Sequence, residues 1–273
     1  MIRTTLALAA ALAVAASAPA GAAPREQRPD LPPPAGKIEH VVLTESFDGN
    51  FSVDGFVPRT LRTELWITAD SAHSVVTDVR TGALRSETAQ WPGGMATFDA
   101  PTNEIWESEP APGVVFSTRA EEGAYLKRSV AKGWMRVTGQ TTHQGRPAVT
   151  LESTGTSPTD IEDARQTVIA DATTYAPLER TMSGRDRGHT FTQVSKVEKA
   201  ELLELAGNEH LLKLGDHPGA RRVTAEEQQA RADAAAAKAR KAREAKARKA
   251  AKAKARKAAR GKRAAASRKA ARR

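Results

Sequence analysis

Basic side chains dominate residues 231–273, which carry 19 Lys and Arg against two acidic residues, a net charge of +17. Side chains at this density neutralise phosphate or carboxylate polymers without reading a sequence, and salt weakens the attraction. The segment has no apolar side chain larger than Ala, so it cannot insert into a membrane as an amphipathic helix does. The candidate polyanion-binding residues are Lys238, Arg240, Lys241, Arg243, Lys246, Arg248, Lys249, Lys252, Lys254, Arg256, Lys257, Arg260, Lys262 and Arg263.

No spacing of titratable residues is typical of catalysis or of metal binding. The sequence has no Cys, which excludes disulfides and thiolate metal sites. Its six histidines show no metal-binding spacing, and a nucleophile elbow or a phosphate-binding Gly loop is absent. The stretch 48–59 is similar to a calcium loop, but Val53 stands where Gly is required and Arg59 where a bidentate Glu is required. We therefore expect a protein that is not an enzyme and that has no metal or cofactor.

Aromatic residues are scarce, at 4% of the chain, so each is a candidate for a core or a cavity position. In an unclosed barrel some of them would line an apolar cavity. Any one of them could equally be an ordinary core residue. The candidate cavity residues are Trp66, Phe98, Trp106, Trp134 and Phe191.

The two ends of the chain differ from its middle. Arg3, an apolar run over 6–16 and the Ala20-Gly21-Ala22 sequence predict a secretory signal peptide at 1–23. Five prolines among charged residues predict an extended linker at 24–36. Outside 231–273, 23 basic residues face 30 acidic ones, a net charge of −7. We thus expect an acidic domain at 37–215 and a basic tail at 216–273, either disordered or helical on a polyanion.

The domain itself is predicted to be mainly β, because apolar and polar residues alternate along most of it. Residues 198–214 are predicted to form a return strand that runs into a short helix or coil at 200–205. One internal helix is predicted at 119–132, with Glu121 and Glu122 early, basic residues late, and Gly133 as its stop. The expected strands are 37–44, 60–67, 73–79, 84–90, 95–98, 103–106, 134–143, 148–153, 166–171, 175–182 and 189–197.

The second half resembles a known superfamily. Gly145-Arg146, a strand ending in Asp171, the Pro177-Leu178-Glu179-Arg180 run, Gly188, and Phe191 with Val194 are similar to the C-terminal half of LolA/LolB/RseB-like proteins. The resemblance spans about residues 38 to 200 and implies an unclosed antiparallel β-barrel wrapped over a helix, with an apolar cavity. It also implies that the domain carries or senses a lipid or lipoprotein acyl group.

Three alternatives remain open at this stage. An RseB-like regulator would bind a membrane anti-sigma protein, although the basic tail stands where such a regulator has a second small domain. A scaffold would only present its tail. The tail also resembles the Lys/Ala/Arg-rich tails of linker histones, so it would bind nucleic acid if the protein is not exported. The protein is expected to be a monomer that is secreted or lies in the periplasmic or cell-envelope space, with an anionic polymer or lipid surface as the partner of its tail.

Overall fold

The computed structural model describes residues 31–49, 59–109, 116–155, 161–186, 189–224, 226–231, 233–234, 237–238 and 241. The predicted signal peptide, most of the proline-rich linker, and most of the basic tail lie outside these residues. The chain divides into two compact units, 1–222 and 223–273. The first unit contains the sheet, the helix and the candidate site.

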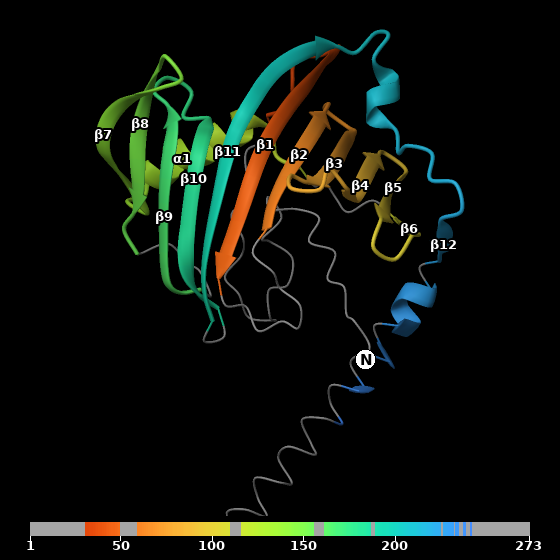
Figure 1. Ribbon diagram of the computed structural model, residues 1–273. Helices are drawn as coiled ribbons and strands as arrows, with labels where there is room; N and C mark the ends of the chain where they lie inside the picture. The colour runs from red at the N-terminus through yellow and green to blue at the C-terminus, as the bar shows by residue number, and fades with distance from the viewer. Residues whose placement is uncertain are drawn as a thin grey trace, which may run out of the picture. The chain divides into compact units, whose positions relative to one another are not determined.

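One sheet organises the first unit, in the order β12-β6-β5-β4-β3-β2-β1-β11-β10-β9-β8-β7. Two meanders, β1–β6 and β7–β11, are joined where β1 pairs antiparallel with β11 (Figure 1). The predicted fold class is confirmed, because the sheet is antiparallel in its recorded pairings, does not close, and curves over a helix. The strands are β1 (Lys37–Gly49), β2 (Arg59–Ile67), β3 (Ala72–Asp78), β4 (Leu84–Trp91), β5 (Gly94–Asp99), β6 (Glu104–Ser108), β7 (Met135–His143), β8 (Arg146–Ser153), β9 (Glu162–Asp171), β10 (Pro177–Asp186), β11 (His189–Glu204) and β12 (Arg221–Val223).

The helix α1 (Arg119–Ala131) begins at a capping box. Thr118 Oγ1 accepts a hydrogen bond from the Glu121 backbone N–H, and the Glu121 carboxylate accepts one from the Thr118 N–H, at 3.1 and 3.0 Å. The helix ends at Ala131 with Lys132 as its C-cap, and the next residue, Gly133, has a φ of +70° that is costly for other residues. These two signals hold α1 within one residue of its predicted bounds.

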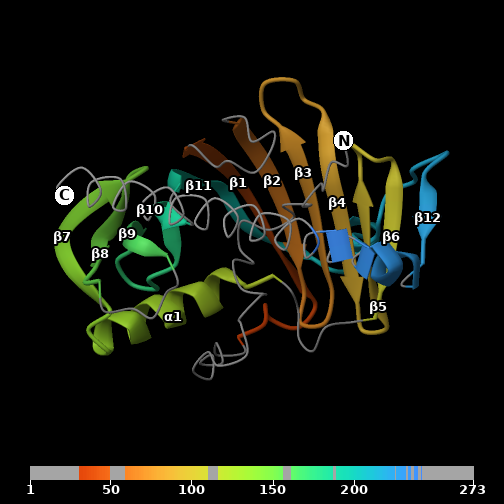
Figure 2. The same ribbon diagram turned by 90° about the horizontal axis from the view of Figure 1, so that it is seen from below.

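The helix lies inside the curve of strands β7–β11 (Figure 2). Leu126 is 0% exposed and packs with Val149, Leu151, Val168 and Ala170 of β8 and β9. A close approach of backbones brings the N-terminal half of α1 against the sheet, since a Cβ added at Gly123 would lie 2.4 Å from the Thr174 carbonyl oxygen. The first turns of α1 are therefore fixed over the concave face.

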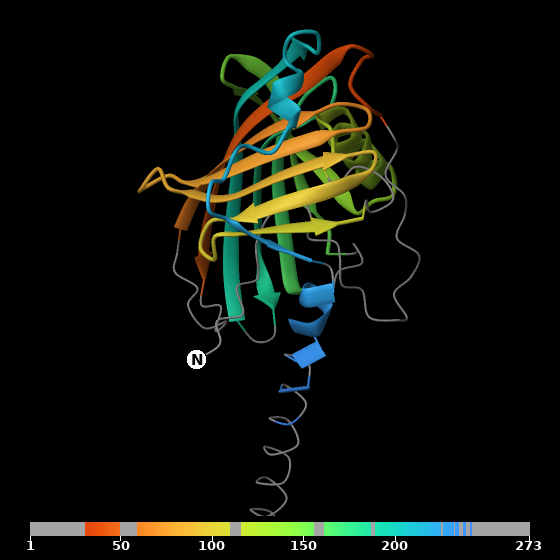
Figure 3. The same cartoon turned by 90° about the vertical axis from the view of Figure 1, so that its right-hand side faces the viewer.

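The opposite, convex face of β3–β6 is crossed by the chain that follows β11 (Figure 3). This segment includes the 3-10 helix η1 (Glu209–Leu212). Its Leu214 and Ala220 pack on Ala96, Phe98 and Ile105 of β5 and β6. The segment therefore gives this face of the first meander an apolar cover.

One predicted element is wrong. Residues 200–205 were expected to form a short helix or coil, but β11 continues as strand to Glu204 and pairs with the start of β1. Ala, Glu and Leu favour helix only weakly compared with a full set of strand hydrogen bonds. An ion pair of Lys37 with Glu204 and a contact of 2.9 Å between His40 Nδ1 and Glu201 Oε1 support the strand.

Candidate functional site

A small cavity of about 50 Å³ lies on the concave face, between the start of α1 and the middle of the sheet. One wall is apolar and the other is charged. The residues that line it are Val41, Leu43, Leu65, Ser117, Arg119, Glu122, Pro177, Leu178, Glu179, Arg180, Ser195 and Val197. These residues come from β1, β2, β10, β11, and α1 with the residues just before it.

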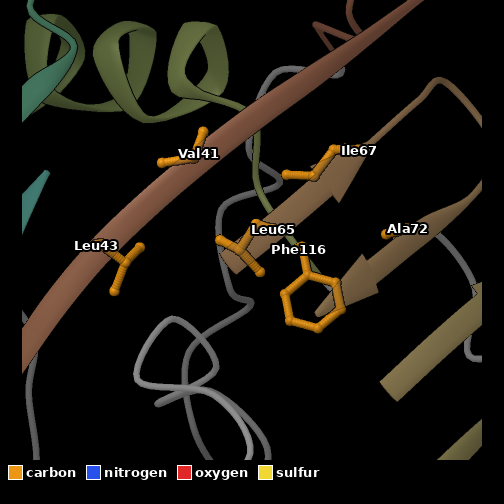
Figure 4. Packing of buried hydrophobic residues seen from close by; sticks show 6 residues of the cluster. All are labelled: Val41, Leu43, Leu65, Ile67, Ala72 and Phe116. Carbon is orange, nitrogen blue, oxygen red and sulfur yellow. The ribbon is translucent and has the colours of Figure 1, made fainter. Parts of the chain in front are cut away.

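The apolar wall continues into a cluster formed by β1, β2 and β3 (Figure 4). Period-2 alternation places Val41, Leu43, Leu65 and Ile67 on the concave side of their strands. Phe116, which precedes α1 and is 6% exposed, packs on this cluster. Phe116 is the one member of the described cluster that does not belong to the sheet.

The charged wall contains an ion pair that joins α1 to β10. The Arg180 guanidinium donates to the Glu122 carboxylate at 2.7 Å, and the two side chains are 23% and 4% exposed. A buried, ionised carboxylate without a neighbouring cation strongly destabilises the folded state. The pair therefore ties the helix to the sheet at the edge of the cavity.

A second carboxyl group, Glu45 of β1, lies on the same face beyond this pair and is 4% exposed. Burial raises the pKa of Glu45 to about 7, although a hydrogen bond from Gln193 and the charge of Arg180 act in the opposite direction. Gln193 Nε2 donates to Glu45 Oε1 at 3.2 Å. Glu45 therefore changes charge near neutral pH inside the concave face.

Replacing Glu45 with Gln is expected to stabilise the protein above neutral pH. Below about pH 4.5 the Glu45 carboxyl is protonated in both the folded and the unfolded protein, so its raised pKa does not change the free energy of unfolding. Above about pH 7 it is ionised in both, and there the raised pKa lowers the free energy of unfolding most. The gain over wild type should therefore grow from near zero at about pH 4.5 to roughly 3 kcal/mol at about pH 8. Urea unfolding at several pH values measures it, and a gain that does not change with pH would contradict the assignment.

The N-terminus of α1 is capped from the sheet as well as by its own residues. The Arg119 backbone N–H lies 3.3 and 3.2 Å from the two carboxylate oxygens of Glu39. Burial raises the pKa of Glu39, and the hydrogen bond from Arg119 and its charge oppose that rise. Burial likewise lowers the pKa of the Arg119 guanidinium, whose buried Nη1 has no hydrogen-bond partner among the described residues. The Nη1 group of Arg119 can therefore donate a hydrogen bond to a further acceptor at the cavity wall.

None of the five aromatic candidates from the sequence lines this cavity. Trp66 stacks between His40 and His73 on the convex face, and Phe98 stacks on His217 there. Trp106 donates to Glu104, and Trp134 lies after α1 with Lys132 over its ring. Phe191 is buried on β11, and period-2 alternation places it on the same, concave face as Gln193 and Ser195. Contact of any of them with a ligand stays a prediction.

Most of the candidate polyanion-binding residues lie outside the described part of the chain. Lys238 and Lys241 are exposed, and nothing in the described residues pairs them with an acidic group. No group of three or more His, Asp or Glu residues in the described ranges could hold a metal ion. No described helix is both long and apolar enough to cross a bilayer.

Sequence reasoning missed the charged residues of the cavity as a site. One signal was present, because Val41, Leu43, Glu45 and Phe47 alternate along β1 and so place a carboxyl group in an otherwise apolar row. Arg180 belongs to the motif on which the resemblance was based, but its partner Glu122 lies 58 residues away in the chain. Such a pairing is set by the packing of α1 and not by local sequence.

The fold and the site together define an open antiparallel sheet that holds a helix and a small amphipathic cavity on its concave face. No family model matches the chain, and no curated protein matches it. Among solved structures the chain is similar to an uncharacterised conserved protein from Thermus thermophilus, at 12% identity and a TM-score of 0.38, covering 67% of this chain and 90% of that one.

Two further solved structures are similar to the chain. A chain in the MucA/MucB complex of Pseudomonas aeruginosa is 15% identical with a TM-score of 0.36, and the match covers 64% of this chain and 56% of that one. The LolA superfamily protein NE2245 from Nitrosomonas europaea is 8% identical with a TM-score of 0.27, covering 64% and 90%. These likenesses concern the fold alone.

Proposed function

We propose that this is an exported, non-enzymatic protein whose sheet domain binds the acyl chain of a lipid or lipoprotein at the concave face. The observation that supports the proposal is the two-sided cavity, in which Val41, Leu43, Leu65 and Val197 face the charged groups of Arg119 and Arg180. An amphipathic molecule fits such a site, because its chain can contact the apolar wall while an acceptor of its head group meets Arg119.

The size of the cavity sets a condition on this function. Sites for molecules of lipid or drug size occupy about 300–1,000 Å³, several times more than the cavity of about 50 Å³. A long chain therefore requires space that side chains now fill. Phe116 packs on the β1–β3 cluster from outside the sheet, so its displacement is one way to extend the apolar wall.

Binding of a fluorescent fatty acid to the full chain tests the proposal. We expect saturable binding with a Kd of about 1 to 10 μM, and a loss of at least about tenfold in Val197→Phe, which fills the apolar wall. Val137→Phe is the matched control, because Val137 is 45% exposed on β7 and lies away from the cavity. Absence of saturable binding in the wild type would leave the domain as a scaffold, and equal affinity in Val197→Phe would show that the fatty acid does not bind in this cavity.

We further propose that the basic tail attaches the protein to an anionic polymer of the cell envelope. Its net charge of +17 over residues 231–273 supports this, together with the acidic remainder of the chain. The membrane anti-sigma partner and the nucleic-acid partner stay predictions, and no contact among the described residues favours either.

Truncation after Thr224 is expected to abolish retention on an anionic polymer and to leave the melting temperature nearly unchanged. The removed residues carry the cationic charge, and 231–273 have no apolar side chain larger than Ala to bury. Retention of the full chain should fall steeply between low and physiological salt. Undiminished retention of the truncated protein would show that the tail is not the attachment site.

A further inference from the structure

Two buried guanidinium nitrogens at the concave-face cavity lack a hydrogen-bond partner among the described residues. They are Nη1 of Arg119 and Nε of Arg180. Both arginines line the cavity of about 50 Å³, and they reach it from different elements, since Arg119 begins α1 and Arg180 lies on β10. A buried donor without an acceptor destabilises the folded state. A ligand that brings acceptors into the cavity therefore relieves this loss.

The other contacts of the two arginines leave these donors unused. Arg180 Nη2 donates to Glu122 Oε2 at 2.7 Å, so the guanidinium is held against α1 at the edge of the cavity. The backbone N–H of Arg119 lies 3.2 Å from a carboxylate oxygen of Glu39, which anchors the first turn of α1 to β1. Neither contact involves Arg119 Nη1 or Arg180 Nε. A ligand can therefore engage both donors without breaking a contact that holds the fold.

The number of donors and the size of the cavity indicate the kind of group that binds there. Two donors on separate side chains match a carboxylate, which has two oxygens and about four lone pairs, whereas a hydroxyl group has one oxygen. Hydrogen bonds from a guanidinium to a carboxylate are also roughly twice as strong as those between neutral groups. The cavity of about 50 Å³ has room for a group of a few atoms and not for a whole acyl chain. It is therefore suited to a small acid group.

The charges around the cavity limit the charge that a ligand can carry. Every charged residue that lines the cavity has an opposite charge beside it: Arg180 has Glu122, Glu179 has Lys196, and Arg119 has Glu39. A phosphate monoester carries between about one and a half and two negative charges near neutral pH, and no excess of positive charge balances it here. A single negative charge shared by two guanidinium groups is easier to accommodate.

We propose that the cavity binds the carboxylate of a long-chain carboxylic acid, with Arg119 Nη1 and Arg180 Nε each donating to one of its oxygens. The inference rests on the proposed function, because the alkyl chain then continues along the apolar wall of Val41, Leu43 and Val197. It narrows the ligand from any acyl lipid to one with a free acid group. Esterified or amide-linked acyl chains carry no charge for the two guanidinium groups to meet.

Glu45 couples this binding to pH. Its carboxyl lies on the same face of β1, and its pKa is about 7 in the free protein because burial raises it while the charge of Arg180 opposes the rise. The groups around it are Leu61 and, one pair further on, Arg59 of β2, Gln193 and Ser195 of β11, Arg180 of β10, and Glu122 of α1, which pairs with Arg180. A ligand carboxylate on Arg180 offsets the positive charge that favours ionised Glu45. The pKa of Glu45 therefore rises further on binding.

The direction of the pH dependence follows from this rise. Below about pH 7 Glu45 is protonated with and without the ligand, so the affinity should not change with pH. Above about pH 7 the free protein has lost this proton and the complex takes it up, so the affinity should fall by at most about tenfold per pH unit. The ligand itself stays ionised, because the pKa of an alkyl carboxylic acid lies near that of Glu, about 4.3.

Isothermal titration calorimetry of the full chain with decanoate, 1-decanol and decyl phosphate tests the site. At about pH 6 and physiological salt, decanoate should bind one-to-one, at least about tenfold more tightly than 1-decanol and more tightly than decyl phosphate. Its affinity should fall about tenfold between about pH 6 and about pH 8.5, and that of 1-decanol should not.

The outcomes separate this inference from the proposed function. Equal affinities for decanoate and 1-decanol would overturn the carboxylate site and leave acyl-chain binding intact, whereas no binding of either would overturn both. Tighter binding of decyl phosphate would overturn the choice of a carboxylate. A decanoate affinity that does not change with pH would show that the acid group does not lie beside Arg180.

Three variants assign the binding to the cavity. Arg119→Met keeps a long side chain without charge or donors, and should weaken decanoate at least about tenfold while affecting 1-decanol far less. Arg136→Met is the matched control, because the Arg136 side chain is 68% exposed on β7. Both variants keep the basic tail, so any attraction of decanoate to the tail cancels in the comparison. Glu45→Gln should bind decanoate with the same affinity at about pH 6 and about pH 8.5.

Unchanged decanoate affinity in Arg119→Met, or a pH dependence that persists in Glu45→Gln, would place the acid group elsewhere. The comparison of decanoate with 1-decanol on the wild type remains decisive if Arg119→Met does not fold.

Discussion

Replacing Leu126 with Ala is expected to lower the free energy of unfolding by about 2 to 5 kcal/mol. Leu126 is 0% exposed and is the central contact of α1 with β8 and β9. Truncation removes its transfer free energy and also leaves a cavity, since Gly123 already brings the helix backbone against the turn at Thr174 and limits any inward shift. Urea unfolding followed by circular dichroism measures the change.

The same substitution at an exposed leucine shows whether the loss of stability depends on the burial of Leu126. Leu202 of β11 is 54% exposed, so Leu202→Ala should change stability by no more than about 0.5 kcal/mol. If Leu126→Ala costs less than about 1 kcal/mol, α1 does not depend on this contact for its position.

Replacing Arg180 with Leu is expected to cost about 3 to 5 kcal/mol. The substitution leaves the carboxylate of Glu122, 4% exposed, without its cation in the interior. The charge of Arg180 also lowers the pKa of Glu45, so the variant should raise that pKa above its present value of about 7. Unfolding at about pH 6 and about pH 8.5 checks both effects, because the loss should be larger at the higher pH.

Two controls show whether the loss comes from an unpaired buried charge. The double variant Arg180→Leu with Glu122→Leu should recover most of the stability, because an apolar pair of similar volume often replaces a buried ion pair at little cost. Arg136→Leu breaks the pair with Glu152, whose side chains are 68% and 40% exposed, and should cost less than about 1 kcal/mol. A double variant as unstable as Arg180→Leu would mean that packing at Arg180, and not charge, is what matters.

Local signals explain why the helix and the hairpins could be predicted from the sequence. The bounds of α1 follow from Thr118 with Glu121 at one end and from Gly133 at the other. The β7–β8 turn is formed by Gln144 and Gly145, with φ of 49° and 77°, the two positive values that a type I′ hairpin turn requires. Both features are encoded within a few residues.

Features that depend on distant residues were not predictable in the same way. The strand end at 200–204 exists because β1 offers hydrogen bonds to it, against the helix preference of Ala, Glu and Leu. Glu122 and Arg180 meet, as do Glu87 and His217, only after the sheet has curved and the chain that follows β11 has crossed it. The histidines looked ordinary in the sequence because His73 and His217 are 144 positions apart and have no metal-binding spacing.

The pairing of β1 with β11 also has a consequence for how the chain folds. Each meander is built from neighbours in sequence, whereas this junction aligns Lys37 with Glu204 and is the longest-range pairing recorded within the first unit. Loop closure over such a distance is entropically costly and slows folding. The β1–β6 meander can therefore form early during synthesis, but the edge of β1 that faces β11 stays unpaired until almost the whole domain has been made. Until then that edge is open to pairing with other chains.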